Sequence, residues 1–303
     1  MPDVRPPAPV VLCLGRTYCD LVFTGLSGLP VLGRELFAES VAIVPGGGAF
    51  ITAAHLVSHG TPAALVTRLG IDPLSTGLDG ALGTSGVDLR FVERAPDAGP
   101  QLTVAMVQPQ DRAFLSRRAG HGRPATLEEA LSCPGVLHLH IAEYATLAEL
   151  PEVITQAKDK GLTVSLDPSW DETLIRDPGL IGSCRGIDVF LPNLEEAFAI
   201  ANTHDPERAL DLLSDHFPLV VLKKGPDGAI LADGEKRYSL TAPRVEVVDT
   251  TGAGDAFNAG FIHSWLAAKD LRTCLEAAIA AGSLSVQAAG GATALMRDSA
   301  PVI

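Results

Sequence analysis

Apolar runs about as long as a buried strand recur along this chain, separated by segments such as 147–160 in which apolar residues follow a helical period. The runs are rich in Val, Leu and Ile, as in parallel strands that are covered on both faces. Strands that alternate with helices predict an α/β fold with a doubly wound, mostly parallel sheet flanked by helices. The predicted strands are 10–14, 63–69, 136–141, 163–166, 189–191 and 219–222.

A second pattern, of short strands and tight turns, marks two segments in the first part of the chain. Residues 16–45 are broken by Gly and Pro, and residues 102–107 and 112–115 alternate with the period of a small antiparallel hairpin. We expect these segments, about 16–45 and 91–118, to form a small β-strand lid over a ligand cleft, inserted in one domain that spans 1–303. Such a lid would exclude water from a reaction in the cleft.

One glycine-rich stretch, Asp-Thr-Thr-Gly-Ala-Gly-Asp at 249–255, follows a short β-like run and opens a helical pattern. Gly252, Ala253 and Gly254 let a ligand approach the backbone, and the first amides of the following helix lack intrahelical acceptors. With the helix dipole, these amides predict a site for a phosphate or a transferring phosphoryl group. Asp255 in the same turn is either an ordinary helix cap or a general base that removes a proton from an alcohol beside that phosphate.

The motif D-T-T-G-A-G-D-A-F at 249–257 resembles the second signature of the ribokinase-like (PfkB) carbohydrate kinases. The resemblance covers nearly the whole chain in order, through Asp20, the glycines at 46 and 47, and the segments 193–196 and 225–255. It implies an ATP-dependent kinase that transfers the γ-phosphoryl group to a hydroxyl of a small sugar or sugar-like alcohol. In such an enzyme Asp255 would be the general base, beside the anion-binding amides of Gly252, Ala253 and Gly254.

The resemblance also assigns residues to the sugar. Asp20 lies where the first predicted strand ends, at the edge where open parallel sheets bind ligands, and its family counterpart holds substrate hydroxyls. Gly46 and Gly47 would allow the backbone to approach the sugar closely.

Two segments depart from the family pattern. Ile51 stands where the family has a substrate-binding Asn, and Thr52 is the neighbour that could replace this Asn in part. The segment 167–172 resembles the family's D-P-N segment, with Ser169 in place of Asn, and would put an acidic stretch beside the incoming nucleotide.

Nucleotide and metal ligands are implied in the second half of the chain. Asn193 and Glu196 match an N-x-x-E element that organises Mg2+ and phosphate through water, although they would also cap a helix. A glycine turn between two strands either makes room for the nucleotide or simply closes a hairpin, and the small-residue helix at 271–289 either supports adenine or packs on its neighbours. The implied nucleotide ligands are Asn193, Lys223, Gly225, Gly228 and Thr250. The implied ligands of a monovalent cation such as K+ are Asp249, Thr251, Ser285 and Gly290.

Net charge and cysteine content limit the classes of partner and the location that we expect for this protein. A net charge of -13 and a pI near 5.0 argue against nucleic acid or an anionic membrane as a partner. The five cysteines are scattered without a C-x-x-C pair, so we expect reduced cysteines in a cytoplasmic protein, with neither disulfides nor a zinc site. The first apolar run is too short for a membrane span. The family resemblance implies a homodimer formed through the lid.

Three alternatives remain open at this point. The fold could carry a non-catalytic sugar or nucleotide sensor instead of a kinase, and the acceptor could be a nucleoside instead of a sugar. His138 and His140 lie on the same face of one predicted strand, so they either hold a metal ion or are hydrogen-bonded polar residues at a strand end.

Overall fold

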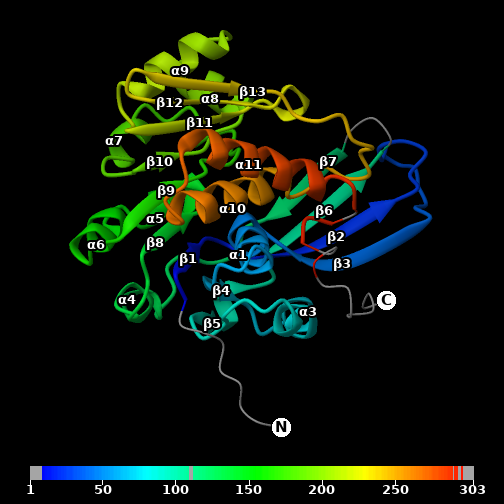
Figure 1. Ribbon diagram of the computed structural model, residues 1–303. Helices are drawn as coiled ribbons and strands as arrows, with labels where there is room; N and C mark the ends of the chain where they lie inside the picture. Colours follow the sequence, from blue (N-terminus) through cyan, green and yellow to red (C-terminus); the bar gives the residue numbers. More distant parts are fainter. Residues whose placement is uncertain (1–8, 109–111, 289, 293–294, 296–303) are drawn as a thin grey trace.

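Strands and helices alternate along the chain, and the strands assemble into one large sheet (Figure 1). The computed structural model describes residues 9–108, 112–288, 290–292 and 295. Over these residues the large sheet has nine strands in the order β13-β12-β11-β10-β9-β8-β1-β4-β5. Neighbours from β11 to β5 are parallel, and β12 and β13 are antiparallel additions at one edge. This arrangement confirms the predicted doubly wound, mostly parallel α/β fold.

The strands of the large sheet match the apolar runs closely. Their bounds are β1 (Val11–Leu14), β4 (Ala63–Leu69), β5 (Val92–Arg94), β8 (His138–Ile141), β9 (Thr163–Leu166), β10 (Val189–Phe190), β11 (Leu219–Lys223), β12 (Ala229–Asp233) and β13 (Lys236–Leu240). The central strand β1 shows why such runs are apolar throughout. Its residues Leu12 and Leu14 pack into one core cluster and Val11 and Cys13 into another, because alternate side chains enter opposite faces.

Helices cover both faces of the sheet. The cluster that contains Leu12 is completed by α4 to α9, whereas α1, α10 and α11 lie on the opposite face, in front of the sheet in Figure 1. The predicted helix at 147–160 is divided into α5 and α6, because Pro151 cannot continue the first helix. The helices are α1 (Gly48–Ser58), α2 (Pro73–Gly77), α3 (Asp79–Thr84), α4 (Leu127–Leu131), α5 (Tyr144–Glu149), α6 (Val153–Asp159), α7 (Leu180–Ser183), α8 (Leu194–Ala201), α9 (Pro206–Ser214), α10 (Ala253–Leu266) and α11 (Leu271–Ser285).

A separate four-stranded sheet lies beside the large one, at the right of Figure 1. It has the order β3-β2-β6-β7 and consists of β2 (Tyr18–Thr24), β3 (Ser40–Gly46), β6 (Leu102–Val107) and β7 (Arg112–Arg117). The β6–β7 pair is the antiparallel hairpin expected from the alternating pattern. The first residues of the second lid segment, in contrast, form β5 and pair with β4 in the large sheet.

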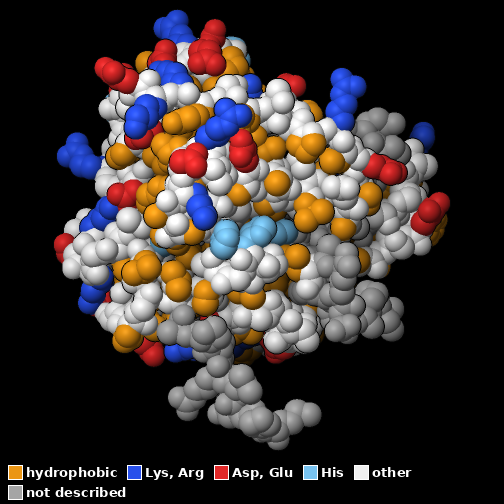
Figure 2. Space-filling view, in the orientation of Figure 1, with side chains coloured by type: hydrophobic (Ala, Val, Ile, Leu, Met, Phe, Trp, Pro, Cys, Tyr) orange, Lys and Arg blue, Asp and Glu red, His pale blue; other side chains and the backbone are white. Residues whose placement is uncertain are grey.

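The surface is mixed in character. On the face that Figure 2 shows, Lys and Arg side chains are interspersed with Asp and Glu side chains, and hydrophobic side chains form spots between them. Within the described part of the chain, each helix is too short or too polar to cross a membrane.

Candidate active site

The glycine-rich stretch at 249–255 makes the start of α10. Gly252 has φ of 73°, in the left-handed region, and a Cβ atom there would lie 2.6 Å from Cα of Gly291, so only glycine fits. The amide of Ala253 donates to the carbonyl of Thr250 and closes the turn. The amides of Gly254 and Asp255 lie in the first turn of α10, where intrahelical acceptors are missing. These two amides are therefore the donors best suited to bind an anion.

Asp255 is partly buried in this turn. A Cβ atom at position 48 would lie 2.8 Å from its Oδ1, so Gly48 at the start of α1 leaves room for the carboxylate. Burial raises the pKa of Asp255 to about 7, and the charges of Asp167 and Asp20 act in the same direction, whereas Lys223 opposes them. A carboxylate with a pKa near neutrality is well suited to accept a proton at physiological pH.

Asp20 lies within the lid strand β2 and not at the end of β1, as predicted from the sequence, because the chain enters a second sheet after β1. Its side chain is almost fully buried and faces the turn that leads into α1. A Cβ atom at position 46 would lie 1.9 Å from its Oδ2, and therefore Gly46 is required for Asp20 to take this position. Gly47 has φ of 91° and precedes the first turn of α1. Burial raises the pKa of Asp20 to about 7, against the hydrogen bond with Thr103, and the charge of Asp249 adds to the increase. The structure thus brings the predicted sugar ligands close to the predicted base.

Two neighbouring side chains on α1, those of Ile51 and Thr52, are buried beside the start of α10. Ile51 is 4% exposed and packs against Gly252 and Gly291, so its side chain supports the glycine turn from behind. The expectation that Thr52 replaces the family Asn as a substrate ligand is wrong. Its side chain is fully buried, and its hydroxyl donates to the backbone carbonyl of Asp255 over 3.4 Å.

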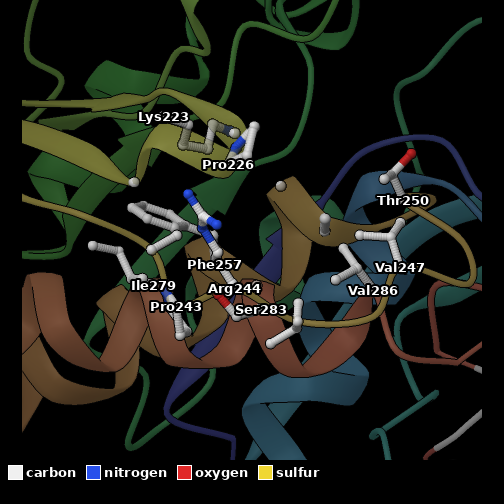
Figure 3. Close-up of a pocket in the computed structure, with 17 residues that line it drawn as sticks. Lys223, Pro226, Pro243, Arg244, Val247, Thr250, Phe257, Ile279, Ser283 and Val286 are labelled. Carbon is white, nitrogen blue, oxygen red and sulfur yellow. The ribbon is translucent and has the colours of Figure 1, made fainter.

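A cavity of about 570 Å³ opens on one side of this turn (Figure 3). Lys223, Gly225, Gly228 and Thr250, all predicted nucleotide ligands, line it together with Ala253 and Gly254. Gly228 has φ of 87°, and a Cβ atom there would lie 2.0 Å from the carbonyl oxygen of Leu240, so the turn requires glycine. The rest of the lining is largely apolar and comes from the loop 242–247 and from α10 and α11. It comprises Pro226, Ala242, Pro243, Arg244, Val245, Val247, Phe257, Ile279, Gly282, Ser283 and Val286.

A smaller cavity of about 230 Å³ opens on the other side, next to Gly47 and Gly48. Gly48, which lines this cavity, faces the carboxylate of Asp255, and Gly254, which lines the larger cavity, precedes Asp255 in the chain, so Asp255 adjoins residues of both cavities. The lining of the smaller cavity is mostly polar and comes from the lid and from the ends of β8 and β9. It comprises Arg16, Tyr18, Gly47, Gly48, Thr103, Ser116, Arg118, Ala142, Glu143, Ala145, Pro168, Ser169, Trp170 and Asp171.

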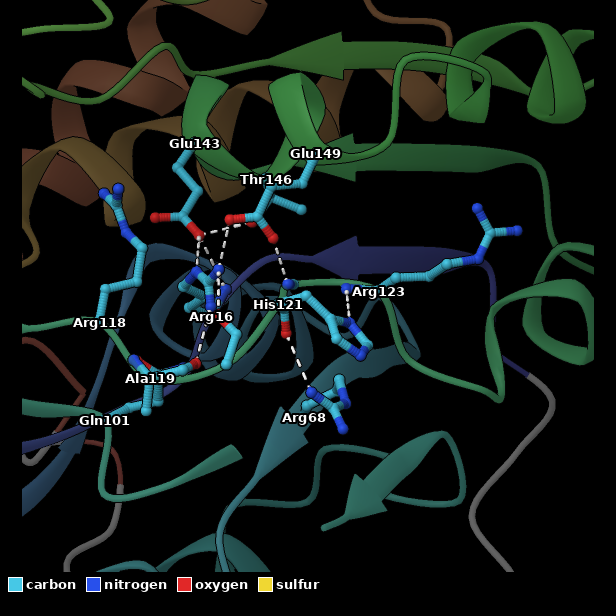
Figure 4. A network of polar contacts seen from close by, with 12 residues as sticks. Arg16, Arg68, Gln101, Arg118, Ala119, His121, Arg123, Glu143, Thr146 and Glu149 are labelled. Carbon is cyan, nitrogen blue, oxygen red and sulfur yellow. Dashed lines mark hydrogen bonds and ion pairs between the residues drawn. The ribbon is translucent and has the colours of Figure 1, made fainter. Parts of the chain in front are cut away.

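Glu143 is the main residue of the smaller cavity that the sequence interpretation missed. Its Oε1 accepts hydrogen bonds from the backbone N of Arg16, at 3.1 Å, and from the hydroxyl of Thr146, at 2.6 Å (Figure 4). These bonds fix the carboxylate beside the cavity. Glu143 follows β8 at the carboxyl edge of the sheet, so the argument that identified Asp20 could also have identified it.

The sequence predicts the acidic segment 167–172 beside the nucleotide, but none of its residues lines the larger cavity. Trp170 and Asp171 line the smaller cavity, and Arg118 of the lid donates to Oδ2 of Asp171 over 3.0 Å. This pairing accounts for Asp171, and Glu172 lies 3.8 Å from Arg176, four residues later in the chain.

Asp167 itself turns inward. Its Oδ2 lies 2.6 Å from Nζ of Lys223 and 2.6 Å from Nδ2 of Asn258. Burial disfavours the charge of Asp167, yet Lys223 and the hydrogen bonds outweigh it and hold the pKa of Asp167 below its usual range.

Asn193 and Glu196 form a complete capping box at the start of α8. The Asn193 side chain accepts from the amide of Glu196, and Glu196 Oε2 accepts from the amide of Asn193 at 2.8 Å. Burial raises the pKa of Glu196 to about 8, and the charge of Asp167 adds to this increase. Among the residues that the structure describes, no cluster of three or more His, Cys, Asp or Glu could hold a metal ion. The oxygen atoms of Asn193 and Glu196 are of the type that binds Mg2+ directly or through water, although the capping box already occupies one oxygen of each.

Three of the four residues implied for a monovalent cation lie together. Oδ1 of Asp249 accepts from the amide and the hydroxyl of Thr251, and its Oδ2 accepts from the amide of Gly290 over 2.8 Å. Arg112 of the lid lies 3.9 Å from the same carboxylate. Ser285 precedes Val286, whose carbonyl accepts from the amides of Val248 and Asp249, and its own hydroxyl donates to the carbonyl of Gly282.

His138 and His140 are hydrogen-bonded polar residues in the sheet. His138 bonds to Thr163 and Ser165, both at 2.8 Å, and His140 bonds to Ser165 at 2.9 Å. Burial lowers the pKa of His138 to about 3 and that of His140 to about 4, so both rings are neutral at physiological pH.

Known proteins resemble this chain in sequence and in fold. Residues 11–297 match the sequence profile of the pfkB family carbohydrate kinases. A 2-dehydro-3-deoxygluconokinase of Bacillus subtilis is 29% identical over 243 residues, which are 74% of this chain and 75% of that protein. An ATP-dependent ribose-1-phosphate kinase of Halopiger xanaduensis is 28% identical over 95% of this chain and 96% of its own length.

A solved structure supports the same assignment at the level of the fold. Arabidopsis thaliana ribokinase complexed with ribose and ATP superposes with a TM-score of 0.81 at 24% identity, covering 97% of this chain and all 100% of that one. Since the profile match spans almost the whole chain, from β1 to beyond α11, the protein belongs to the pfkB family of carbohydrate kinases.

Proposed function

We propose that this enzyme transfers the γ-phosphoryl group of ATP to a hydroxyl of a small sugar or sugar-like alcohol, with Asp255 as the general base. The observation that carries the proposal is that Asp255 adjoins residues that line a large, mainly apolar cavity and a small, polar one. An apolar cavity beside anion-binding amides suits a nucleotide, and a polar cavity suits a polyhydroxylated acceptor.

The larger cavity would hold ATP. The adenine would lie against Ile279 of α11 and Val286 just after that helix, and the phosphates would point toward Lys223 and the amides of Gly254 and Asp255. Bound Mg2+ would neutralise phosphate charge, with Asn193 and Glu196 orienting its water ligands.

The smaller cavity would hold the sugar, with Glu143 in its lining accepting hydrogen bonds from the sugar hydroxyls. Asp20 lies against Gly46, next to the lining residue Gly47, and would accept a hydrogen bond from a hydroxyl at that edge. Asp255 would take the proton of the reacting hydroxyl as its oxygen bonds to the γ-phosphorus and the bond to the β-phosphate oxygen breaks. The proton then resides on Asp255, and ADP leaves with the displaced oxygen. The amides of Gly254 and Asp255 would stabilise the charge on the transferring group.

A monovalent cation such as K+ would act beside the glycine turn. The buried carboxylate of Asp249 joins Thr251 to Gly290, so a cation held there would steady the two segments that frame the turn. Activity in K+ compared with tetramethylammonium, at constant ionic strength, tests this part. Equal activity in the two salts would remove it.

The lid supports two further parts of the proposal. It contributes Tyr18, Thr103, Ser116 and Arg118 to the sugar cavity, so it would exclude water during transfer. Its exposed apolar side chains, Phe114 at 51% and Leu115 at 67%, support a homodimer formed through the lid. The five free cysteines are compatible with the cytoplasmic location expected from the sequence.

A nucleoside acceptor is the second candidate, because Trp170 lines the smaller cavity and its exposed ring could stack on a base. ATP consumption measured against a panel of sugars, sugar acids, sugar phosphates and nucleosides tests both. Turnover of a sugar that is abolished in Asp255→Asn supports the proposal. Binding of sugar or nucleotide without turnover of any panel member would instead identify a sensor.

A further inference from the structure

Three buried polar side chains from different elements meet behind the base. Asp167 follows β9, Lys223 ends β11, and Asn258 lies in the second turn of α10. Nζ of Lys223 is 2.6 Å from Oδ2 of Asp167 and 3.3 Å from Oδ1 of Asn258, and Nδ2 of Asn258 is 2.6 Å from the same Asp167 oxygen. The three residues are 6%, 8% and 0% exposed. We call them the Asp167 cluster.

Stability alone is a poor reason for such a cluster. Removing a Lys–Asp pair from water costs several kcal/mol per ion, and well-packed apolar residues are often as stable. The cluster also lies in an acidic environment, because Glu196 and Asp255 both interact electrostatically with Lys223. A role in the neighbouring site is the alternative explanation.

The position of the cluster links it to the base. Asn258 is three residues after Asp255, so the two side chains project from the same side of α10. Lys223 lines the nucleotide cavity, and a Cβ atom at position 254 would lie 3.5 Å from its Nζ. The cluster therefore contacts the helix that carries the base and places a cation beside the anion-binding turn.

We propose that the Asp167 cluster is a positioning device for Asp255: it fixes the first two turns of α10, and its two opposite charges set the electrostatic environment of the base. The proposal rests on the proposed function of Asp255 and deepens it. Lys223 then serves the carboxylate of Asp255 as well as the nucleotide phosphates, and Asn258 connects the ion pair to the catalytic helix.

Several other groups also face Asp255. Besides the cluster, these are Asp20 from the lid, Glu196 from α8 and the thiol of Cys13 on β1. Of the nearby groups, His140 stays neutral, since burial lowers its pKa to about 4. The charge of Asp167 raises the pKa of Asp255 and that of Lys223 lowers it. Removing Asp167 should therefore lower the pKa of Asp255, and removing Lys223 should raise it.

The test is a direct titration of the base by ¹³C NMR, in protein labelled with [γ-¹³C]aspartate. The Asp255 resonance is assigned by its loss in Asp255→Asn. We expect Asp167→Asn to lower the Asp255 midpoint, and Lys223→Met to raise it, each by roughly one pH unit, as is typical for a charge within 4–6 Å. Asn258→Asp adds an acid beside the base and should also raise the midpoint.

A matched ion pair provides the control. Lys158 and Asp188 lie 2.5 Å apart, away from both cavities, so Lys158→Met and Asp188→Asn should leave the Asp255 midpoint in place. An Asp255 midpoint that stays in place, or that moves in the same direction in folded Asp167→Asn and Lys223→Met, overturns the electrostatic role. Circular dichroism shows which variants fold. If Asp167→Asn or Lys223→Met does not fold, the direction in which Asn258→Asp shifts the Asp255 midpoint tests the same electrostatic role.

Asn258→Leu tests positioning without changing a charge. It removes both hydrogen bonds of Asn258 to the ion pair, and we expect kcat to fall about tenfold, within the range seen when a catalytic group loses its alignment, while KM for ATP stays within about twofold. Unchanged kcat in the folded variant, or in Asn258→Ser if the Leu variant does not fold, would overturn the positioning role. The NMR midpoints do not require turnover, so they test the cluster even if the proposed function fails.

Discussion

The two cavities next to Asp255 are lined by different kinds of residues. The larger one is formed by α10, α11, a glycine turn and the loop 242–247, and its lining is mostly apolar. The smaller one is formed by the lid and by strand ends, and it carries two Arg and two acidic side chains. Under the proposed function, the nucleotide would be selected by shape and backbone, and the acceptor by charged and hydroxyl side chains, several of them from the lid.

The variant with the largest expected effect changes Asp255, which adjoins residues of both cavities. Asp255→Asn keeps the shape of the side chain but removes its capacity to accept a proton. We expect kcat to fall by about 10³, within the 10²–10⁴ usual for a general base, while KM for ATP changes less than about twofold. Steady-state kinetics measure both constants. Near-normal kcat in this variant would exclude Asp255 as the base.

A change on the nucleotide side should leave the acceptor side intact. Gly228→Ala puts a methyl group 2.0 Å from a backbone carbonyl oxygen at a positive φ, so the turn must move. Such a strain costs about 1–2 kcal/mol, and we expect KM for ATP to rise about tenfold with KM for the sugar unchanged. Gly234→Ala is the control, because Gly234 also has a positive φ but has open space around it. Equal effects of the two variants would contradict the role of this turn.

The reciprocal change is Glu143→Gln in the sugar cavity. A hydrogen bond to a charged group contributes about 1.5–3 kcal/mol, so we expect KM for the sugar to rise at least about tenfold, with KM for ATP unchanged. Glu152→Gln removes a similar charge at the surface, in an ion pair with Arg123, and should change neither constant. An effect of Glu143→Gln on ATP alone would reverse the assignment of the cavities.

The pH dependence reports on the ionisation of Asp255. Because burial raises the pKa of Asp255 to about 7, Asp255 is mainly protonated below that pH, and a base at this position would then be inactive. We expect kcat/KM for the sugar to fall at least about tenfold per pH unit below pH 7, because burial also raises the pKa of the proposed sugar ligand Asp20 to about 7. A profile that stays flat down to pH 5 would show that the carboxylate is already ionised there.

The sequence predicted the larger cavity better than the smaller one, for a physical reason. Gly228 and Gly252 are required by local backbone geometry, so they form motifs that are readable in the chain. Glu143 and Arg118, in contrast, are brought together by the packing of the lid against β8, across segments with no local pattern. Thr52 was misassigned for a related reason: its position on α1 was known from the motif, but the direction of its side chain depends on how α1 packs against α10.

Removal of the ion pair between Arg118 of the lid and Asp171 should change KM for the sugar least among these variants. It tests whether the lid contributes to sugar binding through charge. Arg118 and Asp171 are 3.0 Å apart and partly exposed, with 38% and 26% of their side chains accessible. Because solvent screens such a pair, its contribution is about 0–1 kcal/mol, and Arg118→Gln should raise KM for the sugar by about two- to fivefold. Added salt should weaken sugar binding in the unmodified enzyme and have less effect in the variant, since the screened charge has already been removed. A salt dependence that is identical in both proteins would mean that Arg118 acts by shape alone, and the polar cavity would then select its ligand through Asp20 and Glu143.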